Sequence, residues 1–346
     1  MLISMRRSLG LIACALTFVG GVSAAEADFK PRRVAFQRGM SLVDWGDGGY
    51  DKKGVEAQLR KMRSNHVRSV TLIQTWRQDS VSSNVVAPGR SSVPEANLIG
   101  AIRSARRLGL SVVLRPYVDV KGGRWRGRIL PSNRSRWFAS YGNFALHYAR
   151  IAKRERVSVF VFASEMVALS NADPARWSAL AERVRRVFPG PVAYEANWHG
   201  EFATAKWFKS LDVLGISAYF PVCTKPTTNV ESLKAQWLSS AVGRMRDVSS
   251  KLGRPVIFTE IGYRPSRDAC LEPWNTSWVR RTNTLAQTSL YDAAFRVWWD
   301  VPSWFKGMHW WAISPRGLIK APSNHSPLQG AWRSINYWYG RLAASE

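Results

Sequence analysis

The sequence contains few cysteines, few histidines and few acidic residues. Its 346 residues include 3 Cys, 5 His and 24 Asp+Glu, against 50 Lys+Arg. This cysteine content excludes a disulfide-rich scaffold. The histidines show no ligand spacing, so we expect no metal site. No glycine-rich phosphate loop follows the first predicted strand, which argues against a dinucleotide-binding fold, and we expect no cofactor.

Long hydrophobic runs are absent beyond the amino terminus. There, Arg6 and Arg7 precede an apolar run, Leu9–Val22, that ends in small residues up to Ala25. This order is typical of a cleaved secretory signal peptide, which we predict over residues 1–25, followed by a single domain over residues 26–346. The sequence thus predicts a secreted or periplasmic protein without a stable membrane insertion.

The three cysteines divide between these two regions. Cys14 ends a stretch that resembles a bacterial lipobox, but it lies so close to Arg7 that lipidation is the less favoured interpretation. Cys223 and Cys270 remain in the mature chain, and an oxidising compartment favours a disulfide between them. Both follow strand-like segments that a barrel would make neighbours. Two unrelated free thiols are the alternative.

A net charge of +26 raises the question of an acidic partner. The basic residues are scattered along predicted helices and form no compact run or recognised nucleic-acid module, so we expect no nucleic-acid partner. A solubilising surface is the simplest interpretation. Attraction to an acidic polysaccharide or to an anionic envelope surface is the sharper alternative. Nothing indicates an oligomer, and we expect a monomer.

Strand-like segments alternate with helical ones along the whole mature chain. They contain β-branched and aromatic residues without helical periodicity, which is typical of strands covered on both faces. No linker or internal repeat interrupts the series. Eight strands alternating with helices predict a single (β/α)8 barrel. The strands are expected near residues 34, 67, 111, 157, 191, 212, 255 and 307.

Polar and aromatic side chains recur where these strands end, which is where barrels of this kind bind ligands. Glu165 ends the fourth strand and Glu260 the seventh, so the two are expected to face one another across the barrel mouth. The other candidates for this rim are Arg115, Tyr117, Asn197, Trp198, His199, Tyr219, Trp310 and Trp311.

Two carboxylates beside aromatic rings are the elements of glycoside cleavage. One carboxyl group protonates the leaving oxygen, and the other attacks the anomeric carbon if configuration is retained. Indole and phenol rings supply apolar faces for sugar rings. Since Glu165 emerges among Val, Phe and Met neighbours in sequence, we expect burial and the nearby charge of Glu260 to keep Glu165 protonated.

Several motifs in order resemble one family of such enzymes. The segments "LRPYVDVKGGRWRGRI", "VSVFVFASEM", "VAYEANW", "LDVLGISAYFP", "FTEIGYRP" and "HWWAISP" resemble glycoside hydrolase family 113, whose members include β-1,4-mannanases. The resemblance covers most of the mature chain. It implies a retaining hydrolase of β-linked polysaccharide with Glu165 as acid/base and Glu260 as nucleophile. It also implies that Tyr219 binds Glu260 and that Trp311 forms the floor of a sugar subsite.

One position departs from the wider clan of such barrels, which often has asparagine just before the acid/base. Ser164 stands there, and its small hydroxyl as a sugar contact is compatible with the axial 2-hydroxyl of a mannose-type sugar but leaves the sugar specificity open. Arg115 and Tyr117 also differ from many relatives, so distal sugar contacts are expected to differ.

Some interpretations stay open from sequence alone. One of Trp310 and Trp311 is expected only to fill the fold, because adjacent strand residues point to opposite faces. The loop containing Asp44, Trp45 and Asp47 either binds substrate or only turns the chain. Alternative functions are cleavage of an acidic exopolysaccharide and a catalytically silent carbohydrate-binding barrel.

Overall fold

Parallel strands close into a barrel in the computed structural model, which describes residues 29–45, 48–277, 279, 281–300, 303–319 and 325–343. The predicted signal peptide and Asp47 lie outside these residues. Residues 31–346 form one unit by their internal contacts. Among the described helices, none is long and apolar enough to cross a membrane.

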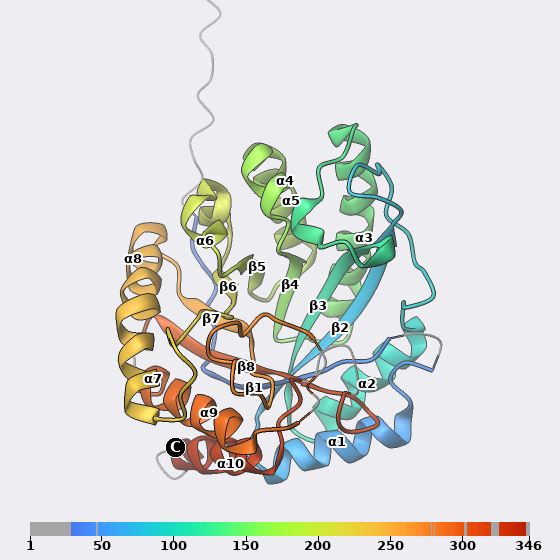
Figure 1. The fold of residues 1–346 in the computed structure, drawn as a ribbon. Helices are drawn as coiled ribbons and strands as arrows, with labels where there is room; N and C mark the ends of the chain where they lie inside the picture. Colours follow the sequence, from blue (N-terminus) through green and yellow to red (C-terminus); the bar gives the residue numbers. More distant parts are fainter. Residues whose placement is uncertain are drawn as a thin grey trace, which may run out of the picture. The chain divides into compact units, whose positions relative to one another are not determined.

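The eight strands pair in chain order, and β8 closes the barrel against β1 (Figure 1). This confirms the predicted (β/α)8 fold. The strands are β1 (Gln37–Leu42), β2 (Ser69–Gln78), β3 (Ser111–Val120), β4 (Val159–Ser164), β5 (Val192–Asn197), β6 (Val213–Ser217), β7 (Val256–Ile261) and β8 (Phe305–Ile313).

Helices follow the strands and pack around them, as Figure 1 shows. The α-helices are α1 (Lys52–Ser64), α2 (Glu95–Arg107), α3 (Arg134–Arg154), α4 (Val167–Ala172), α5 (Pro174–Val187), α6 (Glu201–Thr204), α7 (Val230–Trp237), α8 (Gly243–Leu252), α9 (Thr284–Trp298) and α10 (Gln329–Ala343). Short 3-10 turns are η1 (Lys121–Gly123), η2 (Arg126–Arg128) and η3 (Lys206–Ser210), and a π-turn, η4 (Leu238–Val242), joins α7 to α8.

Residues at the helix ends fix where several helices begin or stop. Asn133 and Asn283 precede α3 and α9, and each side chain accepts a hydrogen bond of 2.9 Å from the backbone N–H three residues on. Such N-caps satisfy donors that have no partner within the helix. Gly253 ends α8 with φ +62°, a conformation that favours glycine.

The barrel interior has two layers of different chemistry. We call the first the apolar layer; it consists of Val34, Val113, Val159, Val161, Ala193, Val213 and Ile257. Two residues further along three of the same strands, the same face carries Arg115, Glu195 and Thr259. Together with Ser164 and Glu260, these form what we call the charged layer. The charged layer lies toward the carboxyl ends of the strands.

Two glycines make room inside this barrel. An alanine at Gly39 would bring its Cβ to 2.4 Å from the ring of His309, whose Nδ1 lies 2.8 Å from the hydroxyl of Thr71. Gly215 pairs with Glu195 across the sheet, and a Cβ there would lie 2.9 Å from Thr259. Both positions therefore require a residue without a side chain.

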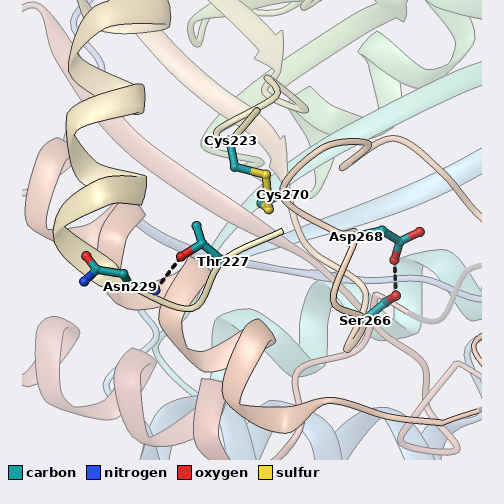
Figure 2. The surroundings of a disulfide bond; sticks show 6 residues. All are labelled: Cys223, Thr227, Asn229, Ser266, Asp268 and Cys270. Atoms are coloured by element: carbon teal, nitrogen blue, oxygen red, sulfur yellow. Dashed lines mark hydrogen bonds between the residues drawn. A yellow bond between two sulfur atoms is a disulfide. The ribbon is translucent and has the colours of Figure 1, made fainter. Parts of the chain in front are cut away.

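A disulfide joins Cys223, after β6, to Cys270, after β7, as predicted (Figure 2). The Cα atoms lie 5.4 Å apart, and the bridge spans 47 residues of sequence. A second link is made by backbone, since the N–H of Val222 donates to the carbonyl of Cys270 at 2.8 Å. The two loops at this side of the barrel mouth are thus fixed to one another.

Candidate active site

Glu165 and Glu260 are both neighbours of Ser217. Glu165 directly follows β4, with φ +52°, and its backbone N–H donates to the carbonyl of Glu195 at 2.8 Å. Ser217 of β6 pairs with Glu260 of β7 in the sheet and donates its hydroxyl to Glu165 Oε1 at 2.7 Å. The strand ends thus bring the two predicted carboxylates to one site.

Glu260 is held by two donors. Arg115 of β3 donates Nη2–H to Glu260 Oε1, and the hydroxyl of Tyr219 donates to Oε2 at 2.9 Å. Burial raises the pKa of Glu260, to about 7; the Arg115 guanidinium opposes this rise, while the carboxylates of Glu195 and Glu165 add to it. The substrate-free site therefore holds a nucleophile candidate that ionises close to neutrality.

Glu165 has polar neighbours, contrary to the expectation of apolar ones. Its Oε1 accepts from Asn197 Nδ2 at 2.8 Å and from Ser217, and its Oε2 accepts from Arg126 Nη1 at 3.2 Å. The apolar residues nearest to Glu165 in sequence are Ala163 and Met166, and both are buried away from solvent. Because Glu165 leaves the strand in a left-handed conformation, its side chain points to the polar barrel mouth and not into the apolar surroundings of Ala163 and Met166.

A buried network lies behind this end of β4. The N–H of Met166 donates to the hydroxyl of Tyr194 at 2.7 Å, and the N–H of Asn197 donates to Glu201 Oε2 at 2.8 Å. Burial raises the pKa of Glu201 to about 8, and the negative charge of Glu165 contributes to this shift. The network fixes the backbone on both sides of the Glu165 carboxyl group.

Sequence reasoning missed Glu195, a third carboxylate in the barrel. It is fully buried and accepts hydrogen bonds from Arg115, Ser164 and, at 2.9 Å, the hydroxyl of Thr259. A signal was present, because Glu195 and Asn197 are two residues apart and side chains so spaced share one face of a strand. Glu195 anchors Arg115 from below while Arg115 binds Glu260.

Arg126 of η2 was also missed. Its Nη2 donates to Asp119 Oδ1 at 2.6 Å, and its guanidinium carbon lies 4.2 Å from the ring centre of Tyr117. It lies in the segment "LRPYVDVKGGRWRGRI" that carries part of the family resemblance, but its loop gives no periodic signal. With Arg126 included, four carboxylates face two guanidinium groups: Asp119, Glu165, Glu195 and Glu260 against Arg115 and Arg126.

Two residues predicted as sugar contacts are bonded to carboxylates inside the barrel. Arg115 is fully buried and engaged with Glu195 and Glu260, and Ser164 is 1% exposed with its hydroxyl bonded to Glu195. Neither presents a free polar group at the rim. Ser164 turns inward because the pairing of β4 with β5 shifts register between Val161 and Ser164.

The aromatic candidates are separated by the fold. Trp310 is buried and stacks on Tyr291 of α9, with ring centres 3.8 Å apart, whereas Trp311 faces inward, 5.4 Å from the Arg115 guanidinium. Trp311 thus lies beside the carboxylates, and Trp310 only packs between the barrel and α9.

Further aromatics lie on two sides of the mouth. Trp198, which follows Asn197, stacks on the exposed Trp274 with ring centres 4.7 Å apart and meets His199 edge to face. On the other side, Trp45 donates its indole N–H to the hydroxyl of Tyr117 at 3.3 Å. Asp44 is buried and accepts from the N–H groups of Trp45 and Tyr50, so it shapes this loop.

Within the described residues, no cluster of His, Cys, Asp and Glu side chains has the arrangement of a metal site. The chemistry available at the mouth is that of two carboxylic acids beside exposed or half-buried aromatic rings. Those are the groups that glycoside cleavage requires.

The family model of Glycoside Hydrolase Family 113 matches residues 43–324, which include every residue of this site. The chain belongs to glycoside hydrolase family 113. It is therefore a glycoside hydrolase. A comparison with curated proteins gives no significant match.

Solved structures of family 113 members have the same fold. One, a β-1,4-mannanase, is 26% identical, with 89% of this chain and 99% of that chain covered and a TM-score of 0.77. The β-mannanase AaManA from Alicyclobacillus acidocaldarius, solved with ManMIm, is 24% identical, with 90% and 99% covered and the same TM-score. A family 5 mannosidase from Rhizomucor miehei is 13% identical, with 90% and 94% covered and a TM-score of 0.61.

Proposed function

We propose that this family 113 hydrolase cleaves β-1,4-linked mannan-type polysaccharide by double displacement, with Glu260 as nucleophile and Glu165 as acid/base. The observation that carries the assignment is the pair of donors on Glu260. Arg115 and Tyr219 hold its carboxylate in place and stabilise its ionised form, as a nucleophile requires. Glu165 accepts from an amide and a hydroxyl at one oxygen and, at 3.2 Å, from the Arg126 guanidinium at the other.

The reaction proceeds in two steps, and Glu165 loses a proton in the first and regains one in the second. The Glu260 carboxylate attacks the anomeric carbon, while Glu165 donates its proton to the departing glycosidic oxygen. Glu165, now ionised, then takes a proton from water, and the resulting hydroxide attacks the same carbon and releases Glu260. Each inversion cancels the other, so the product keeps the β configuration.

The sugar assignment rests on the relatives and on the aromatic rings. The solved family 113 structures that resemble this chain are β-1,4-mannanases. Trp311 beside Glu260, and the Trp198–Trp274 stack beside Asn197, offer rings on both sides of the cleavage point, where sugars pack on apolar faces.

Product stereochemistry tests this mechanism. Proton NMR of the first turnovers on a β-1,4-mannooligosaccharide is expected to show the β anomer, which mutarotates later. The α anomer would contradict double displacement. Reducing-sugar release from mannans, glucans and uronate-containing polymers is expected to be highest on mannans. Binding without release from any of them would favour a silent carbohydrate-binding barrel.

We further propose that residues 1–25 are removed as a signal peptide and that residues 26–346 act as a monomer in the periplasm or outside the cell. The disulfide supports an oxidising compartment. Mass spectrometry of protein recovered from the periplasm is expected to show a chain that begins at residue 26, without lipid on Cys14. A lipid-modified Cys14 at the new amino terminus would contradict this.

A further inference from the structure

A groove lies beside the barrel mouth, between the loop after β2 and the start of η1. Its volume is about 670 Å³, and its lining includes Trp45, Arg77, Asp79, Pro88, Arg90 and Lys121. Trp45 connects it to the candidate active site, because the indole N–H donates to Tyr117, whose ring contacts Arg126. A glycan bound across the carboxylates could therefore continue into this groove.

The shape of the groove is fixed by backbone. Arg77 and Ala87 exchange two hydrogen bonds, of 2.8 Å and 2.9 Å, so the loop after β2 folds back on the end of that strand. The Arg77 side chain is oriented by one further bond, from Nε to Ser91 Oγ at 2.6 Å. Its two terminal nitrogens make no hydrogen bond to the described part of the chain. Arg77 thus presents a positioned guanidinium edge to the groove.

The charge of the groove is positive. Arg77, Arg90 and Lys121 face a single carboxylate, Asp79, which pairs with Lys121 at 3.0 Å. The two arginines remain without an acidic partner among the described residues. Trp45, 37% exposed, supplies an apolar surface at the end nearest the active site. A stacking ring and two guanidinium groups in one groove match a sugar that carries a carboxylate, because guanidinium binds carboxylate through two parallel hydrogen bonds.

We propose that this groove, which we call the β2-loop groove, is a subsite for a carboxylate-bearing sugar in the glycan, beyond the units that contact Glu165 and Glu260. The inference rests on the proposed function, and it narrows the substrate from a neutral mannan to a mannan-type chain with uronate-like units or acidic substituents. Trp45 stacks on the ring, and Arg77 and Arg90 bind its carboxylate.

Binding measurements test the subsite without turnover. The probes are a β-1,4-mannooligosaccharide and the same oligosaccharide with part of its 6-hydroxyl groups oxidised to carboxylates. Both are titrated calorimetrically against mature Glu260→Gln protein. We expect the oxidised probe to bind more tightly. The double variant Arg77→Gln/Arg90→Gln should reduce that preference about 10- to 100-fold, as expected for lost charged hydrogen bonds.

A matched control separates the subsite from general charge. Arg60→Gln/Arg106→Gln removes the same charge from exposed positions on α1 and α2, and should leave the preference for the oxidised probe unchanged. Equal loss in both double variants, or no loss in either, would overturn the proposal. So would an equally large dependence on Arg77 and Arg90 for dextran sulfate, which shares the charge but not the sugar.

The outcome is distinguishable from failure of the proposed function. If wild-type protein cleaves no mannan, the function fails whatever the binding data show. If wild-type protein cleaves neutral mannan but shows no preference for the oxidised probe that depends on Arg77 and Arg90, only the subsite proposal is contradicted.

Discussion

The apolar layer and the charged layer of the barrel are built on the same strands but contribute differently. In the apolar layer, Val113, Ala193 and Ile257 belong to one buried cluster of aliphatic side chains. Two residues on, Arg115, Glu195 and Thr259 form hydrogen bonds in a buried setting. Burying apolar groups stabilises the fold, whereas a buried ion pair gains little after its desolvation. The comparison suggests that the first layer holds the barrel closed and the second prepares the reaction.

Removing the charge of Glu260 should have the largest effect on activity. Glu260→Gln keeps the shape of the side chain and removes the proposed nucleophile, so kcat is expected to fall by about 10⁴-fold or more. The melting temperature measured by circular dichroism should change little in comparison. An active variant would show that the charged layer does not supply the nucleophile.

Removing Glu165 should lower the rate less, because in the proposed mechanism Glu165 transfers a proton and forms no covalent bond. Glu165→Ala is expected to lower kcat about 10²- to 10⁴-fold on mannooligosaccharides. On an aryl mannoside with a good leaving group the loss in the first step should be smaller, since little protonation is needed. Stopped-flow release of the phenol measures this step, and equal losses on both substrates would contradict the role.

The apolar layer should respond in stability and hardly in rate. Val161→Ala removes two buried methyl groups and is expected to lower the free energy of unfolding by about 2 kcal/mol. Leu285→Ala, at a position 63% exposed, is the control and should change it by less than about 0.5 kcal/mol. Urea denaturation measures both. If Val161→Ala instead lowered kcat as strongly as Glu165→Ala, the division between the layers would not hold.

A smaller effect, on the pH dependence of activity, distinguishes the contributions of Glu195 and Glu260 within the charged layer. Because the proposed nucleophile Glu260 would have to be ionised to attack, and burial raises its pKa to about 7, kcat/KM is expected to fall below that pH. Glu195 contributes to the rise, so Glu195→Gln should lower the pKa of Glu260 and shift the acidic limb to lower pH. Its loss also leaves Arg115 free to pair with Glu260 alone, which acts in the same direction.

Glu201→Gln is the matched control for this shift. Burial raises the pKa of Glu201 to about 8, so this carboxyl group is already largely neutral where the limb lies. The limb should therefore stay in place in that variant. A shift toward higher pH in Glu195→Gln, or the same shift in both variants, would contradict the assignment.

The sequence alone was sufficient for those features that depend on local pattern. Apolar strand composition predicted the barrel, and the barrel placed Glu165 and Glu260 at strand ends and Cys223 beside Cys270. Register was not visible, so the shift in β4 that turns Ser164 toward Glu195 was missed. Arg126 lies in an irregular loop, where no periodicity indicates direction. Its contact with Glu165 depends on how distant segments fold together.

The left-handed backbone at Glu165 implies a trade-off between durability and catalysis at this one residue. A non-glycine residue with φ +52° is sterically unfavourable, and glycine or asparagine adopts that conformation more readily. Replacing Glu165 by either residue would relax the chain where it leaves β4 and at the same time remove the proposed proton donor. Repeated selection for thermal stability alone would therefore favour a more stable but inactive barrel. Only selection for catalytic turnover would retain the glutamate.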